Sequence, residues 1–515
     1  MREKYVLRNF IAKLFSTALV TILSFVSKKV FLDSLGDTTM GLHALLLSVL
    51  SMLSLLELGI GNAIYFSLYK PLAEDDQEQT AAIVRMYAKI YRVIGALVFG
   101  IGMILMPFLH FFVSTKLPDR IMYTAYIIML VDTSLSYYMA YRRNIFNADQ
   151  KEYFNTNVDT CINLAVSCVQ MLTVVLTHNF YLFLAVKMVG TVAGNLYIYY
   201  HSGKKYPYLK KKSEYRLPKE FMDTFIENVK ALCVVNISSY LVFGTDNLLL
   251  SKYTDLTAVF IYSNYTAILT AVNQVFHTVF NSMQASVGNF MVLEGKEKTY
   301  GLFKKIFFLN FLITGYTSVA LVTLFNDAIT VWMGKDYVWH IGIILVLVFN
   351  NYSRYVTQAI GIFKNAAGLY SPYPAFKYLT LLEGLINLAA SLFFIVVCDM
   401  GVLGVFLGTS VSTVVNTVAV PHAVYKYYFK ISVFDYVKRY VQYILLTVAY
   451  CGISIGLYQW IRTENLILNL VLGVIISFVV PIGITSLLYH KTEEFQFVWD
   501  TVMKYVNKVL KRKEA

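Results

Sequence analysis

The sequence predicts an all-α integral membrane protein with about 14 transmembrane helices. Hydrophobic residues make up 57% of the 515 residues and charged residues only 15%, whereas a soluble chain carries about 25% charged residues. Long apolar stretches occupy most of the chain, and crossing the hydrocarbon core takes about 20 such residues in a helix. These runs are continuous and lack the alternation of barrel strands, so helices are expected.

The apolar stretches follow one another with mostly short loops between them. In chain order they cover 10–32, 40–69, 86–113, 121–146, 157–178, 180–200, 224–250, 256–292, 303–325, 337–363, 375–397, 402–425, 437–461 and 466–489. The first stretch contains Lys13 and is too long for the apolar region of a signal peptide, so we expect it to remain as a helix.

Positive charge gathers on one side of this topology. The net charge is +13, which by itself would allow a nucleic-acid partner. Counted alternately from a cytoplasmic N-terminus, however, the loops of one side hold about six times as many Lys and Arg residues as the other. The charge therefore predicts an orientation with both termini in the cytoplasm, contact with the lipid bilayer, and no nucleic-acid partner.

The basic segment 204–220 predicts a division into two lobes. It follows six stretches and would link an N-lobe at 1–203 to a C-lobe of six more helices at 221–431. Residues 30–44 align with 248–262 at an offset of 218, which places Asp37 on Asp255. Two halves of six helices share one orientation, as in transporters that rock two bundles around a midplane site. Two added helices would occupy 432–490.

The C-terminal segment 491–515 has apolar residues at helical spacing among many lysines. It predicts a basic amphipathic helix on the inner leaflet, with a solvated tail as the alternative.

Several charged residues fall within the apolar stretches, where charge is costly and usually faces a cavity or a partner. The candidates are Lys13, Lys28, Lys29, Glu57, Asp132, Arg142, Arg143, Lys187, Asp246, Arg354 and Glu383. Five of them lie near the ends of their stretches and could instead extend to the membrane surface, namely Lys28, Lys29, Arg142, Arg143 and Lys187. A structural ion pair between Asp246 and Arg354 is also open.

Polar residues also recur at spacings of three or four along 256–292, which places them on one helix face. They are Thr266, Thr270, Asn273, His277, Asn281 and Gln284. A similar series comprises Thr133, Ser136, Tyr137, Arg143 and Asn147. Such faces line water or another helix, so hydrogen bonding between helices is the alternative. The pattern predicts a hydrophilic cavity, cationic on balance. No cysteine or histidine spacing indicates a metal site.

The chain resembles the Wzx-type oligosaccharide flippases, the polysaccharide-transport branch of the MOP (MATE-like) exporter superfamily. The resemblance rests on segments spread along the chain: SKKVFLDSLG (27–36), SLLELGIGNAIYFSLYKPLAEDD (54–76), SYYMAYRRNIFNADQKEY (136–153), FGTDNLLLSKY (243–253), YSNYTAILTAVNQVFHTVFNSMQASVGN (262–289) and GVLGVFLGTSVS (401–412). It implies a MATE-like fold and a carrier, not an enzyme. The carrier would move undecaprenyl-diphosphate-linked repeat units to the outer leaflet for capsular polysaccharide or exopolysaccharide synthesis. A polymerase and other assembly proteins are candidate partners.

The resemblance also implies roles for the charged residues. Lys28, Lys29 and Arg354 would contact the diphosphate, with Arg142 and Arg143 as capture residues at the inner rim. No cofactor is expected beyond a coupling H⁺ or Na⁺, for which Asp246, Glu57 and Glu383 are the candidate carboxylates. The 218-residue offset also sets Lys28 against Asp246 as a candidate gate.

Two other functions remain as alternatives. One is an ion-coupled multidrug exporter of the same superfamily, whose cationic cargo a cavity rich in Lys and Arg should repel. The other is a membrane polymerase or glycosyltransferase of the same pathway, which would need a large outer loop. The outer loop at 326–337 is short, and no phosphate-binding glycine loop is present.

Overall fold

The computed structural model describes residues 2–57, 60–113, 117–210, 215, 217–367 and 375–511, and these form helices and their connections without any strand. Ten helices within these residues are long and apolar enough to cross a membrane. They are Phe15–Leu35, Gln77–Phe112, Glu152–Thr177, Phe180–Lys205, Lys219–Tyr253, Lys296–Trp332, Tyr378–Val397, Gly401–Phe429, Phe434–Ile461 and Leu466–Tyr489. The prediction of an all-α, multi-pass membrane protein is confirmed.

The chain divides into two compact units, Met1–Ser263 and Asn264–Ala515. The first unit contains α1 (Arg2–Leu35), α2 (Asp37–Leu53), η1 (Ser54–Glu57), α3 (Ile60–Ala73), α4 (Gln77–Leu105), η2 (Met106–Phe108), α5 (Leu109–Phe112), α6 (Asp119–Ala140), α7 (Arg143–Ala148), α8 (Glu152–Thr177), α9 (Phe180–Lys205), η3 (Pro207–Lys210), α10 (Lys219–Phe243), α11 (Thr245–Tyr253) and the start of α12 (Leu256–Leu293). The boundary between the units thus falls within α12 and not at 204–220. The two predicted lobes, which rest on helix order, stay a prediction.

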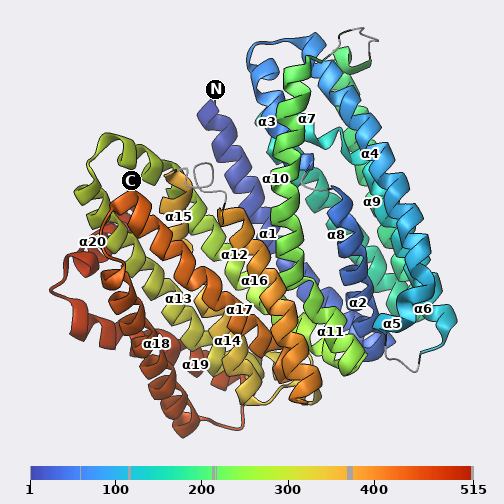
Figure 1. Ribbon diagram of the computed structural model, residues 1–515. Helices are drawn as coiled ribbons and strands as arrows, with labels where there is room; N and C mark the ends of the chain where they lie inside the picture. The colour runs from blue at the N-terminus through green and yellow to red at the C-terminus, as the bar shows by residue number, and fades with distance from the viewer. Residues whose placement is uncertain are drawn as a thin grey trace. The chain divides into compact units, whose positions relative to one another are not determined.

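The second unit contains the rest of α12 and the helices that follow it. These are α13 (Lys296–Trp332), η4 (Lys335–Tyr337), α14 (Ile341–Tyr355), α15 (Gln358–Ala366), α16 (Ala375–Leu392), η5 (Phe393–Val397), α17 (Gly401–Ala423), η6 (Val424–Phe429), α18 (Phe434–Ile461), α19 (Leu466–Tyr489) and α20 (Glu493–Lys511). Within this unit α16 and α17 pack side by side, as do α13 and α19 (Figure 1).

Each predicted apolar stretch lies on a helix or on a broken helix, although the count of fourteen spans stays a prediction. The stretch 121–146 breaks at Tyr141 and Arg142, between α6 and α7, and 224–250 breaks at Gly244, between α10 and α11. Kinks of this kind arise at glycines and where side chains interrupt the helical ladder. At the first break, two consecutive arginines enter different surroundings.

Close helix contacts in the first unit depend on small residues. α8 packs against both α1 and α9 in this unit (Figure 1). A Cβ atom added at Gly190 of α9 would lie 2.1 Å from Cγ2 of Val166 on α8. Since such a distance is far below van der Waals contact, the sequence needs glycine here to let the two helices approach.

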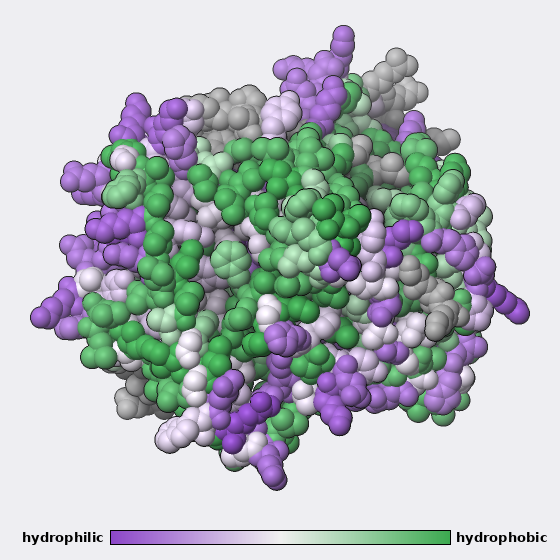
Figure 2. All heavy atoms as spheres, turned by 60° about the horizontal axis from the view of Figure 1, so that its bottom comes forward, coloured by the Kyte–Doolittle hydropathy of each residue, from purple (hydrophilic) through white to green (hydrophobic). Residues whose placement is uncertain are grey.

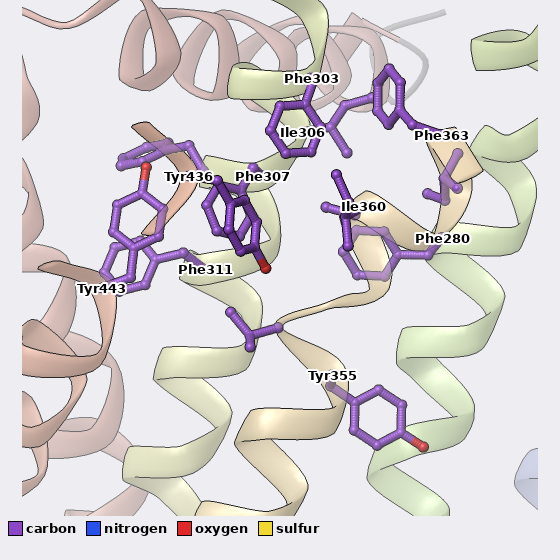
Figure 3. Close-up of a cluster of buried hydrophobic side chains, with 14 of the residues drawn as sticks. Phe280, Phe303, Ile306, Phe307, Phe311, Tyr355, Ile360, Phe363, Tyr436 and Tyr443 are labelled. Atoms are coloured by element: carbon purple, nitrogen blue, oxygen red, sulfur yellow. The ribbon is translucent and has the colours of Figure 1, made fainter. Parts of the chain in front are cut away.

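An aromatic cluster forms the core of the second unit. Phe303, Phe307 and Phe311 recur every four residues on α13, so they share one face of that helix. Phe311 stacks on Tyr443 of α18 with ring centroids 4.2 Å apart, and Phe307 stacks on Tyr436 at 5.0 Å (Figure 3). Stacked aromatic pairs add about 0.5–1.5 kcal/mol to the burial of their area.

The predicted tail helix is present as α20, and residues 512–515 of the predicted segment lie outside the described part. α20 packs on α13, and Phe495 and Val498 contact the aromatic cluster. Two of its glutamates pair with lysine and arginine of the bundle, Lys305 with Glu493 and Arg439 with Glu494. Its place on the inner leaflet stays a prediction.

The surface is largely apolar where a soluble protein would be polar. Figure 2 shows broad hydrophobic areas on one face of the molecule. Exposed side chains include Leu176, Leu487 and Trp460, each more than three-quarters accessible. Exposed apolar area of this extent marks a surface that another apolar phase covers, which fits a bilayer.

Candidate functional site

The first unit contains an open polar cavity of about 700 Å³. Its walls come from η1, α3, α4, α6, α7, α8, α9 and α10. Described residues lining it are Ser54, Glu57, Gly61, Tyr91, Asp132, Thr133, Ser136, Tyr137, Ala140, Arg143, Asn144, Asn147, Glu152, Asn155, Thr156, Asp159, Thr191 and Asn236. We call this space the large cavity.

One wall of the large cavity is the polar face predicted from the sequence. Thr133, Ser136 and Tyr137 of α6 line it, and Arg143 and Asn147 continue the wall on α7. Thr133 and Ser136 direct their hydroxyls to carbonyls of their own helix, at 2.9 and 2.7 Å. The hydroxyls of Thr133 and Ser136 therefore bond within α6 and not to a neighbouring helix, and both residues face the cavity.

Arg143 is held in an ion pair at this wall. Its Nη1 donates to both carboxylate oxygens of Asp159 on α8 at 2.8 Å, and its Nε donates to Oδ1 of Asn195 at 2.8 Å. A guanidinium bound in this way is positioned by two helices. An anionic ligand would have to compete with Asp159 for it.

Arg142, the neighbour in sequence, lies elsewhere. It is only 7% exposed, and its guanidinium carbon sits 4.3 Å from the centre of the Tyr199 ring. Its Nη1 reaches Oγ of Ser202 at 3.4 Å. Through these contacts Arg142 packs against α9 at the end of α6. It is not among the described residues that line the large cavity.

Two buried asparagines leave hydrogen-bonding atoms unused at the large cavity. Asn155 is 5% exposed and donates through Nδ2 to the carbonyl of Arg143 and to Oδ1 of Asn147, while its own Oδ1 has no partner. Asn144 is 7% exposed, and its Nδ2 has no partner. An unpaired buried polar atom costs about 1–3 kcal/mol, so such atoms usually bind water or a ligand. Sequence reasoning did not select either residue.

The acidic residues of the large cavity outnumber its basic ones. Its described lining has four carboxylates, Glu57, Asp132, Glu152 and Asp159, and one guanidinium, Arg143. Glu57 accepts a hydrogen bond from the Tyr91 hydroxyl at 2.7 Å. This lining differs from the predicted cationic one, because the acidic residues come from three separate helices that meet only in the fold.

A second cavity of about 580 Å³, which we call the lysine cavity, contains Lys28. Its lining also includes His43, Asn163, Asn247 and several serines. The Lys28 ammonium donates to the backbone carbonyl of Ser263 at 2.8 Å. Lys29 pairs with Asp33 at 2.9 Å on the same helix and is not among the described residues lining this cavity.

Asp246, the predicted gating partner of Lys28, accepts a hydrogen bond from the Tyr262 hydroxyl at 2.7 Å. Its neighbour Asn247 lines the lysine cavity and donates to Oγ of Ser48 at 2.8 Å. Lys28 thus donates to Ser263 and Asp246 accepts from Tyr262, and the pairing of the two charged residues as a gate stays a prediction.

A third, smaller cavity of about 460 Å³ shares residues with both of the others. It has Ser48 and Ser51 in common with the lysine cavity, and Ser54 and Asn236 in common with the large cavity. The three serines are spaced by three residues along α2 and η1, so they follow one face. The spacing is visible in the sequence, but only the fold shows that the first two serines line one of the larger cavities and the third lines the other.

The remaining predicted residues lie in the second unit. Asn273 donates to Oδ1 of Asn351 on α14 at 2.9 Å, and the His277 ring is 3.4 Å from the Tyr355 hydroxyl. These two members of the α12 stripe therefore bond to another helix, which was the alternative interpretation. Asn281 is exposed and Gln284 partly buried.

Arg354 and Glu383 also lie in the second unit, on α14 and α16. They interact electrostatically, and the Glu383 carboxylate accepts a hydrogen bond from Asn416 on α17. Glu383 is buried, at 8% exposure. Among the described residues no group of three or more His, Cys, Asp or Glu side chains is arranged to hold a metal ion.

The fold is similar to that of known transporters. It matches the lipid II flippase MurJ in an inward closed conformation with a TM-score of 0.67 and 15% identity, over 94% of this chain and 98% of that one. It matches an inward-facing multidrug resistance MATE family transporter of the MOP superfamily with a TM-score of 0.57 and 11% identity, over 79% and 96%. A MOP superfamily transporter from Pyrococcus furiosus aligns with a TM-score of 0.52 and 12% identity, over 81% and 94%.

At such identities these likenesses establish the fold and not the cargo. A comparison with curated proteins finds no match. The model of a family described as "Polysaccharide biosynthesis protein" matches residues 6–283, which is more than half of the chain. The resemblance noted in the sequence and the MATE-like fold that it implied are confirmed, and the chain belongs to the polysaccharide biosynthesis protein family.

Proposed function

We propose that this protein is a flippase for undecaprenyl-diphosphate-linked oligosaccharide repeat units. It would carry them from the inner to the outer leaflet of a bacterial plasma membrane for capsular polysaccharide or exopolysaccharide synthesis. Family membership and a fold shared with a lipid II flippase support this cargo class. The observation that carries the proposal is the large cavity, a hydrophilic space of about 700 Å³ inside a bundle of membrane helices.

The lining of the large cavity suits a sugar headgroup. Sugar hydroxyls both donate and accept hydrogen bonds, and the cavity offers amides, hydroxyls and carboxylates from several helices. The free atoms on Asn144 and Asn155 would gain partners when a sugar enters. Such a gain makes transfer of the polar headgroup across the membrane less costly, while the polyprenyl chain stays in lipid.

The diphosphate would bind at the lysine cavity. Lys28 lies there with its ammonium on a neutral carbonyl, so a diphosphate could take it without breaking an ion pair. The third cavity, which shares residues with both, gives a polar surface along Ser48, Ser51 and Ser54. Alternating access of the two predicted lobes would then expose the headgroup to each side in turn.

Coupling to H⁺ or Na⁺ remains part of the proposal, with Glu57, Asp246 and Glu383 as the candidate carboxylates. Both termini would lie in the cytoplasm, as the distribution of positive charge indicates. The polymerase that consumes the flipped unit would be a natural partner at the outer leaflet.

The test is transport by the purified protein in vesicles. A fluorescent polyprenyl-diphosphate oligosaccharide is placed in both leaflets, and a membrane-impermeant quencher reports movement of the inner pool to the outside. We expect vesicles with protein to lose nearly all signal and protein-free vesicles to lose about half. Equal signal in the two samples would refute the proposal. In cells, deletion should stop polymer export and accumulate cytoplasmic lipid-linked units.

A multidrug exporter is the second candidate, and the excess of carboxylates over guanidinium groups in the described lining of the large cavity favours it, since a net negative charge would attract a cationic drug. The fold shared with a multidrug resistance transporter is compatible with it. A deletion strain that loses drug resistance and keeps normal polymer would establish this function instead. The third alternative, a polymerase or glycosyltransferase, is disfavoured because the structural neighbours are transporters.

A further inference from the structure

The charge of the large cavity limits which glycans can enter it. We infer that the protein selects repeat units whose sugars carry no negative charge, and that Glu57 and Asp132 exclude uronic acids and other acidic sugars. The inference rests on the proposed flippase function and names the chemical class of its cargo.

Two of the four carboxylates in the large cavity are neutralised by neighbours. Asp159 pairs with Arg143 at 2.8 Å, and Glu152 pairs with Lys13 at 3.5 Å. Each pair holds its two side chains at the wall, and the charges of the two side chains cancel. They therefore neither attract nor repel a sugar strongly.

Glu57 and Asp132 are not neutralised by an ion pair in this way. Neither joins an ion pair with another residue in the described part of the chain. Glu57 is bound by the neutral Tyr91 hydroxyl, and Oδ1 of Asp132 is buried without a hydrogen-bond partner. Lys187 acts on Asp132 electrostatically from beyond ion-pair distance. The two carboxylates come from η1 and α6 and face one space, so their fields add there.

The neutral groups of the same cavity provide the attraction that a sugar needs. Asn144 and Asn155, each less than a tenth exposed, leave one donor and one acceptor atom unpaired at the wall. A neutral sugar hydroxyl can bind either atom. A sugar carboxylate can only accept, and it would bring a third negative charge beside Glu57 and Asp132.

The two larger cavities thus differ in charge. The lysine cavity has Lys28 in its lining and no carboxylate among its described residues, whereas the large cavity is acidic. In one cargo molecule, the anionic diphosphate would be directed to the lysine cavity and the uncharged glycan to the large cavity. Repulsion of the wrong partner is an effective source of specificity, because like charges in a medium of low polarity interact strongly.

The experiment compares two cargo analogues that differ at one carbon. Each is a fluorescent polyprenyl-diphosphate trisaccharide that ends in glucose or in glucuronic acid, and each is offered to the intact protein in vesicles. We expect the glucose analogue to move at least about tenfold faster. In the double variant Glu57→Gln with Asp132→Asn the ratio should fall toward about one. Because the readout is a ratio, it does not depend on how the variant changes the overall rate.

Matched controls remove carboxylates away from the cavity. Asp119→Asn and Glu294→Gln alter exposed residues that pair with His110 and Lys298, and the ratio should stay at the wild-type value. Equal movement of both analogues by the wild-type protein, or a double variant with an unchanged ratio, would overturn the charge selection and leave the flippase function intact. Failure of the wild-type protein to move either analogue would refute the proposed function itself.

Discussion

The ion pair between Arg143 and Asp159 offers a quantitative test of how the large cavity is held together. Replacing Asp159 with Asn removes the charge that Nη1 contacts through two oxygens at 2.8 Å while keeping the size of the side chain. Arg143 then keeps the bond from Nε to Asn195 and at most one bond to the neutral amide oxygen of the new side chain. We expect α7 and α8 to lose part of their mutual attachment.

The size of the effect follows from geometry and exposure. A hydrogen bond to a charged group contributes about 1.5–3 kcal/mol when shielded from water. Here the side chains of Arg143 and Asp159 are 25% and 42% exposed, so solvent screening reduces the value. We expect a coupling free energy of about 1–2 kcal/mol between the two residues.

A double-mutant cycle measures this coupling. The variants Arg143→Gln, Asp159→Asn and their combination are compared with the wild-type protein by unfolding in detergent. The double variant should be more stable than the sum of the two single losses predicts, by about 1–2 kcal/mol. Additive losses would show that the pair contributes nothing, and our account of this wall would then be incorrect.

Three further predictions test packing and ligand contacts. Gly190→Leu should lower the unfolding temperature by several degrees, because a Cβ atom at this position would lie 2.1 Å from a methyl carbon of Val166. The control Gly100→Leu should have little effect, because a Cβ atom there meets no atom within 4 Å. Phe311→Ala should destabilise the second unit by about 3–5 kcal/mol, and the half-exposed Phe99→Ala by much less, as measured by detergent unfolding. Lys28→Met should slow vesicle transport of a diphosphate-linked cargo at least about tenfold and that of a monophosphate-linked one less, and equal slowing would contradict a diphosphate contact.

Much of the fold was predictable because its signals are local. Apolar length and the absence of strand alternation predict membrane helices at the positions where the structure has them. The α6 series of Thr133, Ser136 and Tyr137 also identified a true cavity wall, since helical spacing alone places such residues on one face.

The candidate site was predicted only in part, because neighbours in sequence need not share surroundings. Arg142 and Arg143 are adjacent and were assigned one role. Because the helix breaks at Tyr141 and Arg142, however, Arg142 lies against the Tyr199 ring and Arg143 lies at the cavity wall. The same limit applies to the α12 stripe, where Asn273 satisfies a polar group of α14. A periodic pattern shows that a face is polar but not what it faces.

By itself, the sequence determined that this chain is a helical membrane protein, which residues are apolar enough to cross the bilayer, and to which family it belongs. Only the tertiary structure decided that carboxylates from η1, α6 and α8 meet in one cavity, that Lys28 lies in another, and that three serines of a third cavity are shared with these two. The physical reason is that hydropathy and helical period act over a few turns of chain. The charge of a cavity, in contrast, is a sum over helices brought together by packing.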